Sequence, residues 1–269
     1  MSSTQDAESF KSISPLDGIR KKVVQTIEYY DMLSPNDKVL VAVSGGKDSS
    51  LLLFLLKEIQ KRAPFPFHIH PVILDQKQPG FTVAHFRRWV NNLGFKLEVI
   101  EEDTYSIVKE KVIESKTFCG LCSRLRRGII YNYAYENGFN KIALGHHADD
   151  LIETLLMNQF YSGTLGSMPP KLLSDDRRNV IIRPMAKIFE SEIVRATELI
   201  NPPIIPCNLC GSQENLKRKQ IKKLISEMEK NNPAIKYSLI GSIGNVKPSQ
   251  LLDRNIFDFN FHGETVGEI

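Results

Sequence analysis

The chain has 269 residues, of which 42% are hydrophobic and 25% are charged, and its formal net charge is +4. This length suffices for one α/β domain with appendages, and the composition is that of a soluble globular protein. No apolar run reaches the roughly 18 residues of a membrane span, and the polar segment Met1 to Phe10 lacks a signal-peptide core. We therefore expect a cytoplasmic protein that does not enter membranes.

Strands and helices are predicted to alternate along the chain. Residues 1–15 are expected to be disordered, and residues 16–33 carry apolar side chains at helical spacing. Strands are predicted at 38–43, 68–75, 95–100, 141–144 and 181–183. Helices are predicted at about 50–62, 82–93, 106–115, 123–137, 150–161, 190–200 and 213–230. This order indicates an α/β fold with a doubly wound, mostly parallel sheet of about five strands and helical additions at both ends. We expect residues 16–269 to form one domain with cysteine-bearing helical segments at 106–137 and 201–230.

The first strand runs directly into the sequence Ser-Gly-Gly-Lys-Asp-Ser at residues 44–49, which we call the glycine turn. Its two glycines let the backbone bend tightly and approach a ligand. The free N–H groups and the dipole of the helix that follows favour an anion, and serine hydroxyls and a lysine add donors. The pattern predicts a phosphate or pyrophosphate site formed by Ser44, Gly45, Gly46, Lys47, Asp48 and Ser49.

Two further polar segments follow predicted strands. Asp75 ends the second strand, and Gly145, His146, Asp149 and Asp150 follow the fourth. Ligands of parallel sheets bind at the carboxyl ends of strands, so we expect these residues to meet the glycine turn in one crevice. Carboxylates beside a phosphate suit Mg²⁺, for which Asp48 and Asp149 are the candidates. In the alternative interpretation, Asp149 and Asp150 only cap the start of the helix that follows.

All four cysteines occur in two Cys-x-x-Cys pairs, Cys119/Cys122 and Cys207/Cys210. In a cytosolic chain such pairs indicate metal or redox chemistry. The pairs are too far apart for a local zinc knuckle, but two distant segments can close on one centre. Zinc, an iron–sulfur centre and a dithiol/disulfide couple all remain open.

Basic residues adjoin both cysteine pairs. Arg124, Arg126 and Arg127 follow the first pair, and a lysine- and arginine-rich stretch at 217–223 follows the second. Positive charge beside a candidate site is typical of proteins that bind a phosphate backbone, although solvated helix faces have the same composition.

The glycine turn resembles the PP-loop of ATP pyrophosphatases, which cleave ATP to AMP and pyrophosphate. The sequence Gly-His-x-x-Asp-Asp-x-x-Glu-Thr, which begins at Gly145, resembles the second signature of that superfamily. The sequences Cys-Gly-Leu-Cys-Ser-Arg-Leu-Arg-Arg-Gly at 119–128 and Pro-Cys-Asn-Leu-Cys-Gly-Ser-Gln at 206–213 extend the likeness. From about Lys38 to Phe259 the chain resembles the tRNA 2-thiocytidine synthetases, the TtcA group of tRNA-cytidine(32) 2-sulfurtransferases.

The resemblance implies an ATP- and Mg²⁺-dependent tRNA sulfurtransferase that adenylates the C2 oxygen of a cytidine and replaces it with sulfur. It also implies a homodimer with a [4Fe-4S] cluster on three cysteines, and a sulfur donor such as a cysteine desulfurase system. Carried onto this chain, the cluster ligands are Cys119, Cys122 and Cys207, with Cys210 as the alternative third ligand. The expected catalytic set is Lys47, Asp48 and the three cysteines.

Two other functions fit the same motifs. One is thiolation of a different tRNA base, as in the thiouridine branch of the superfamily. The other is a non-catalytic nucleotide-binding module with zinc in four thiolates. The sulfurtransferase hypotheses require the cysteine pairs to face the cavity of the glycine turn.

Overall fold

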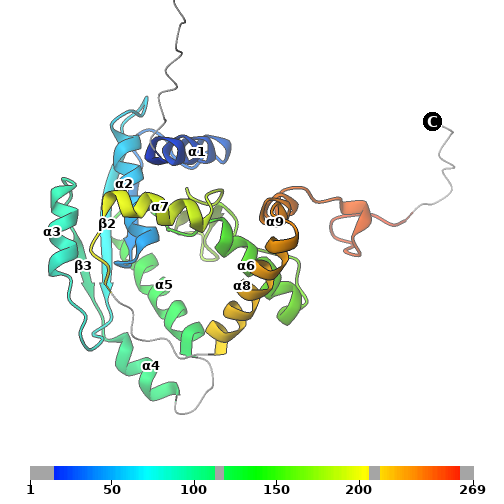
Figure 1. Ribbon diagram of the computed structural model, residues 1–269. Coiled ribbons are helices and arrows are strands. Elements are labelled where there is room, and N and C mark those ends of the chain that lie inside the picture. The colour runs from blue at the N-terminus through cyan, green and yellow to red at the C-terminus, as the bar shows by residue number, and fades with distance from the viewer. Residues whose placement is uncertain (1–14, 113–117, 206–212, 261–269) are drawn as a thin grey trace, which may run out of the picture.

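The computed structural model describes residues 15–112, 118–205 and 213–260 and contains a six-stranded sheet (Figure 1). The strands are β1 Lys38–Val43, β2 His68–Asp75, β3 Glu98–Glu101, β4 Lys141–Ala143, β5 Lys171–Leu173 and β6 Val180–Ile182. Their order is β3-β2-β1-β4-β6-β5, and β5 alone pairs antiparallel. The predicted doubly wound, mostly parallel fold is therefore confirmed. The strand β5 was not expected, because its three residues are all exposed and show no buried apolar pattern.

The helices follow the predicted order with three differences. They are α1 Pro15–Tyr29, α2 Lys47–Gln60, α3 Ala84–Asn92, α4 Thr104–Val112, α5 Phe118–Glu136, α6 Ala148–Ser162, α7 Glu190–Ile200, α8 Gln213–Asn231 and α9 Ile235–Ile243, with a 3-10 turn at Pro248–Gln250. Pro15 already belongs to α1, although it was assigned to the disordered N-terminus; residues 1–14 lie outside the described part. The long helix α5 begins at Phe118, five residues earlier than expected. The helix α9 was not predicted.

Helices cover both faces of the central strands. Val39 and Val41 of β1 pack with buried residues of α1, α2 and α7, whereas Leu40 packs with Ile130 and Ala134 of α5 on the other face. Both faces of β1 are thus buried, which explains why its sequence is a continuous apolar run rather than an alternating one.

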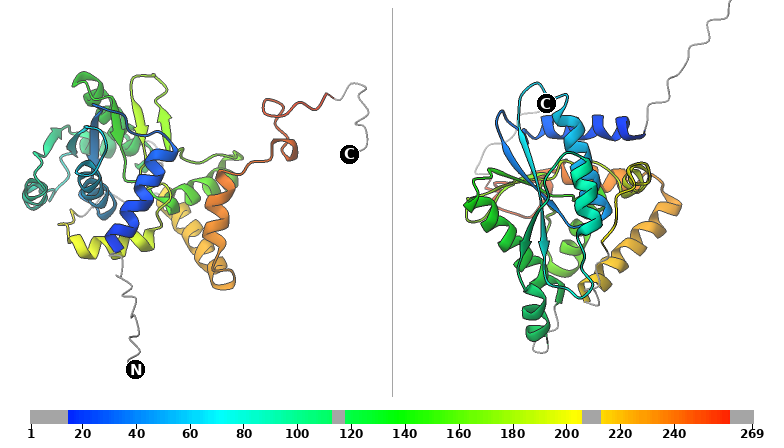
Figure 2. Two further views of the ribbon diagram at one scale, coloured as in Figure 1. Left: turned by 90° about the horizontal axis from the view of Figure 1, so that it is seen from above. Right: turned by 90° about the vertical axis from the view of Figure 1, so that its left-hand side faces the viewer.

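The helices α8 and α9 lie side by side with α6 beyond the sheet (Figures 1 and 2). Ile221 and Ile225 of α8 are buried against Ile152 and Leu156 of α6 and Phe189, which precedes α7. This second core places the N-terminal half of α8 next to the first turns of α6 and α7. Within the described part of the chain, no helix is both long enough and apolar enough to span a membrane.

The order of the strands creates a switch point between β1 and β4. The chain winds from β1 through β2 to β3 on one side and returns to β4 on the other side of β1. Loops that leave the carboxyl ends of β1 and β4 therefore diverge and leave a crevice. The glycine turn follows β1, and residues 144–147 follow β4.

Candidate functional site

The glycine turn is held closed by its own serines. The N–H of Ser44 donates to Oγ of Ser49 (3.0 Å), and the N–H of Gly46 lies 3.3 Å from Oγ of Ser44. The hydroxyls of Ser49 and Ser50 both donate to the carbonyl of Gly46, at 3.1 and 2.9 Å. Gly45 has a φ of +76°, a left-handed conformation that favours glycine. The serines thus shape the turn, and α2 begins within it, at Lys47.

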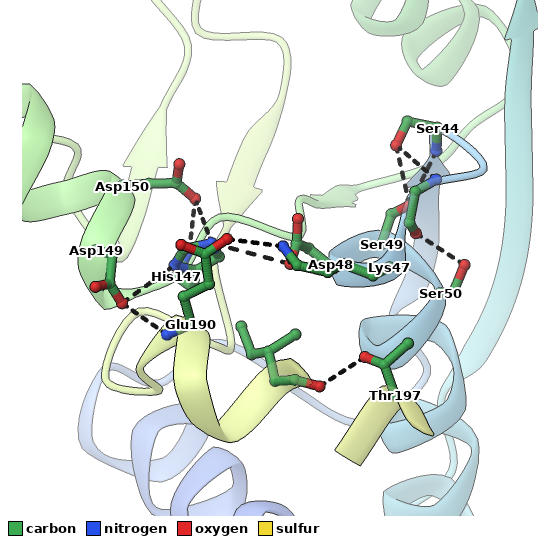
Figure 3. Close-up of polar contacts among 12 residues, drawn as sticks. Ser44, Lys47, Asp48, Ser49, Ser50, His147, Asp149, Asp150, Glu190 and Thr197 are labelled. Carbon is green, nitrogen blue, oxygen red and sulfur yellow. Dashed lines mark hydrogen bonds and ion pairs between the residues drawn. The ribbon is translucent and has the colours of Figure 1, made fainter. Parts of the chain in front are cut away.

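Lys47 is shared between two carboxylates (Figure 3). Its Nζ lies 2.8 Å from Oδ1 of Asp48 and 3.0 Å from Oε1 of Glu190. Burial lowers the pKa of Lys47, but hydrogen bonds and charge from both carboxylates outweigh it and raise that pKa overall. Burial would raise the pKa of Glu190, yet the neighbouring Lys47 and Lys222 bring it down to about 2. Both partners are therefore charged at neutral pH.

The loop after β4 touches the glycine turn directly. A Cβ added to Gly145 would lie 3.0 Å from the backbone N of Ser49 and 3.1 Å from the carbonyl carbon of Asp48. This spacing is tighter than ordinary side-chain contacts, so a residue without a side chain suits this position. The predicted meeting of these two loops is confirmed.

His147 lies at the centre of an acidic group (Figure 3). Its Nε2 is 3.4 Å from Asp150 and 3.9 Å from Asp48, and its Nδ1 is 3.7 Å from Asp149. The side chain is buried, with 5% of its surface exposed. Sequence analysis named His146, and not His147, as the nucleotide contact, and that assignment stays a prediction.

The ring of His146 is turned to a different partner. Its Nδ1 accepts a hydrogen bond from Nε of Arg183 at 3.3 Å. Burial, with the Arg183 charge as the next cause, lowers the pKa of His146 to about 4. The imidazole is therefore neutral at pH 7 and serves as an acceptor.

Asp149 and Asp150 organise helix starts. Asp149 accepts the N–H of Glu190 at 2.6 Å and pairs with Lys236 of α9 at 3.2 Å. Asp150 accepts the N–H of His147 at 3.1 Å. Asp150 therefore caps its own helix, whereas Asp149 caps α7. In the described residues no three His, Cys, Asp or Glu side chains form a metal-binding group, so the assignment of Mg²⁺ to Asp48 and Asp149 stays a prediction.

A cavity of about 180 Å³ opens beside the glycine turn. Its lining residues come from the turn, the end of β2 with the loop that follows, α5 and the end of the segment after α7: Ser44, Gly46, Leu74, Gln76, Gln78, Phe81, Arg126 and Ile205. Asp75 was predicted to line this crevice, but its carboxylate accepts the N–H of Lys77 at 2.7 Å, and the neighbouring Gln76 lines the cavity instead. The sequence did not single out Gln76, because it does not show which of two neighbouring residues at the end of a strand faces the cavity.

Cys122 of the first cysteine pair lies next to this cavity. Sγ of Cys122 is 3.2 Å from Oε1 of Gln76, and Arg126, one helical turn later, lines the cavity itself. The cysteines were expected ahead of the long helix, but Cys119 and Cys122 lie in the first two turns of α5.

The second cysteine pair, Cys207 and Cys210, lies outside the described residues, as does the side chain of Cys119. The residues that precede the second pair are described as far as Ile205. The N–H of Ile205 donates to the carbonyl of Gly45 at 2.9 Å. Three side-chain atoms of Ile205 would lie 2.7 Å from a Cβ at Gly45. Ile205, the last described residue before the second cysteine pair, therefore lies directly over the glycine turn.

Comparisons with known proteins agree with this geometry. Residues 17–201 match the PP-loop domain family. The tRNA-cytidine(32) 2-sulfurtransferase of Bdellovibrio bacteriovorus is 54% identical over 90% of this chain and 93% of its own length. The tRNA-cytidine(32) 2-sulfurtransferase 1 of Francisella tularensis subsp. tularensis is 49% identical over 96% of both chains.

A solved structure supports the fold. It is the U34-tRNA thiolase NcsA from Methanococcus maripaludis with its [4Fe-4S] cluster, with a TM-score of 0.71, 22% identity, and coverage of 87% of this chain and 80% of that one. With the sequence relatives, the glycine turn and the adjoining cysteine helix, these findings identify the chain as a PP-loop protein that belongs to the family of tRNA-cytidine(32) 2-sulfurtransferases.

Proposed function

We propose that this chain uses ATP to convert cytidine at position 32 of tRNA into 2-thiocytidine. The names of its relatives support this activity. The observation that carries the proposal is the position of Cys122, whose sulfur lies 3.2 Å from the side chain of Gln76. Gln76 lines the same cavity as Ser44 and Gly46 of the glycine turn. A sulfur site and a phosphate site on one cavity are what a thiolation by way of an adenylated base requires.

In this proposal the glycine turn binds the phosphates of ATP. The first N–H groups of α2 and the ammonium of Lys47 stabilise the charge that develops on pyrophosphate as it leaves. Adenylation converts the C2 oxygen of the base into a good leaving group, because the bond between C2 and this oxygen can then break with release of AMP. Asp48 and Asp149 are the proposed Mg²⁺ contacts, together with phosphate oxygens. Gly145 lets the opposite loop close on the turn, and His146, held by Arg183, is a candidate acceptor for the nucleotide.

The cysteines fit an iron–sulfur cluster by their chemistry and placement. Thiolates are the usual ligands of such clusters, and Cys122 faces the side of α5 that adjoins the cavity. Cys119, Cys122 and Cys207 would hold the cluster, with Cys210 as the alternative to Cys207. Held by these three cysteines, a [4Fe-4S] cluster would supply, as sulfide obtained from the sulfur donor, the sulfur that replaces the activated oxygen. Gln76 and Arg126 line the cavity beside the turn, and Gln76 contacts Cys122.

The substrate and partners complete the proposal. Arg124 and Arg127 are exposed on α5 and are suited to tRNA phosphates, whereas Arg126 faces the cavity. An unpaired anticodon-loop base is accessible to such a site. We further propose that residues 16–269 act as one domain, that the protein is a cytoplasmic homodimer, and that a cysteine desulfurase system provides the sulfur.

The decisive experiment is reconstitution without oxygen. Protein with ATP, Mg²⁺, sulfide and tRNA should form 2-thiocytidine, measured by nucleoside mass spectrometry. Cys119→Ala should abolish this product and leave the affinity for ATP largely intact. Ser123→Ala, an exposed residue of the same helix turn, is the matched control and should keep full activity. Full activity of Cys119→Ala would disprove the role of the cysteines.

The same material separates the alternative functions. A brown protein with labile sulfide and broad absorbance near about 400 nm supports the cluster. A colourless protein with one bound zinc and no labile sulfide supports the non-catalytic module. Loss of thiouridine with intact thiocytidine in tRNA from a deletion strain would assign the chain to thiolation of another base.

A further inference from the structure

Lys47 faces two carboxylates, whose combined negative charge exceeds the single positive charge of its ammonium. Asp48 and Glu190 both contact its Nζ, at 2.8 and 3.0 Å. The side chains of Lys47 and Glu190 are each about one third exposed, at 32% and 34%, so a phosphate can approach the pair. A phosphate that binds the glycine turn must compete with these carboxylates for the lysine. Asp48 is the next residue in the chain, whereas Glu190 is brought in from α7.

The position of Glu190 is fixed from two sides. It is the first residue of α7, and its N–H donates to Oδ2 of Asp149 at 2.6 Å. Its second carboxylate oxygen, Oε2, lies 3.3 Å from Nζ of Lys222 in α8. Glu190 therefore bridges the lysine of the glycine turn and a lysine of α8.

Lys222 is itself divided between two acids. Its Nζ lies 3.5 Å from Oε1 of Glu153, whose side chain is only 3% exposed. Arg218 of α8 contacts the same carboxylate at 3.5 Å and also lies 3.5 Å from Asp150. The two cations of α8 thus dock onto the acids at the start of α6. A buried carboxylate such as that of Glu153 is destabilising without a cation. The charge of Lys222 is therefore shared and neutralises Glu190 only in part.

We propose that Glu190 is a positioning residue that restrains Lys47, and that Lys222 of α8 weakens this restraint by drawing on the same carboxylate. The inference rests on the proposed binding of ATP phosphates at the glycine turn. It makes α8, which begins three residues after Cys210, part of the machinery that sets phosphate affinity. The contacts form a continuous chain from Lys47 through Glu190 to Lys222 and Glu153.

Opposite effects on affinity follow from this arrangement. Glu190→Gln removes the competing charge and frees Lys47 for phosphate, so Mg²⁺-dependent binding should become tighter by up to about fivefold, the upper end for a partly exposed ion pair. Lys222→Met leaves the whole charge of Glu190 to Lys47, so binding should become weaker by a similar factor. A residue that only supports the fold would lower affinity when replaced, not raise it.

Calorimetric titration with two probes, pyrophosphate and a non-hydrolysable ATP analogue, each with Mg²⁺, measures these effects. Glu192→Gln is the matched control, because this residue also lies in the first turn of α7 but pairs with Lys22 of α1. It should leave both affinities unchanged. Thermal unfolding of each variant reports whether the fold is intact.

The double variant Glu190→Gln/Lys222→Met tests whether Lys222 changes phosphate affinity through Glu190. If Lys222 acts through Glu190, its replacement in the Glu190→Gln background should change affinity far less than it does alone. An undiminished effect would overturn the role given to Lys222. Weaker binding by Glu190→Gln, as expected of a Mg²⁺ ligand, would overturn the role given to Glu190. Wild-type protein that binds neither probe would instead refute the proposed function on which the inference rests.

Discussion

Gly45 is the position where a single methyl group should disturb both halves of the site. Its φ of +76° favours glycine, and an alanine Cβ there would lie 2.7 Å from Cβ, Cγ1 and Cδ1 of Ile205. One of these atoms is the Cβ of Ile205, so rotation of the side chain cannot relieve the contact. The backbone near Ile205 must then move, and its 2.9 Å hydrogen bond to the carbonyl of Gly45 is lost or stretched.

The cost of Gly45→Ala follows from two contributions. A left-handed backbone costs an alanine about 1–2 kcal/mol, and overpacking costs about 1–3 kcal/mol. The free energy of unfolding should therefore fall by about 2–5 kcal/mol. Gly138→Ala is the matched control, because Gly138 has a φ of +70° but no heavy atom of the described residues lies within 4 Å of its added Cβ. This variant should lose only the first contribution, about 1–2 kcal/mol.

Urea denaturation gives both free energies, and titration with Mg²⁺ and a non-hydrolysable ATP analogue gives the affinities. Gly45→Ala should weaken nucleotide binding, whereas Gly138→Ala should not. Ile205→Ala removes two of the three clashing atoms, so adding it to Gly45→Ala should recover part of the lost stability. Equal losses for Gly45→Ala and Gly138→Ala, with no recovery, would refute the seating of Ile205 on the glycine turn.

Two further changes test the electrostatics of the site. Burial raises the pKa of Glu153 to about 7, although Lys222 and Arg218 oppose this, so the folded protein holds its proton more tightly than the unfolded chain. The resulting stability is fully present below the ordinary glutamate pKa of 4.5 and is lost as the pH rises through about 7. Urea denaturation should therefore show that wild type loses stability relative to Glu153→Gln between about pH 5 and about pH 8, because glutamine does not titrate; a pH-independent difference would contradict the assignment. Arg126→Ala should weaken nucleotide binding about tenfold because the guanidinium lines the cavity, whereas Arg124→Ala, exposed on the same helix, should leave it unchanged. Equal affinities in this pair would place the nucleotide elsewhere.

Much of the fold could be predicted because its signals are local. The apolar run Val39 to Val43 indicates a strand buried on both faces, and the glycine turn that follows indicates a helix start open to anions. Asp150 was expected at the nucleotide site, with a helix cap as the alternative; it does cap α6, and its nucleotide role stays a prediction. The strand β5 and helix α9 were missed, because β5 is fully exposed and α9 has no fully buried side chain to produce a periodic pattern.

The sequence by itself determined which chemistry the chain carries: a phosphate-binding turn, two cysteine pairs and acids after a strand end. Tertiary structure alone decided their partners. Winding of the sheet brings Gln76 and Cys122 to the cavity, and packing of α7 and α8 sets Glu190 between Lys47 and Lys222. Such contacts join residues far apart in the chain. They depend on strand order and helix packing, which no local period of hydrophobic residues encodes.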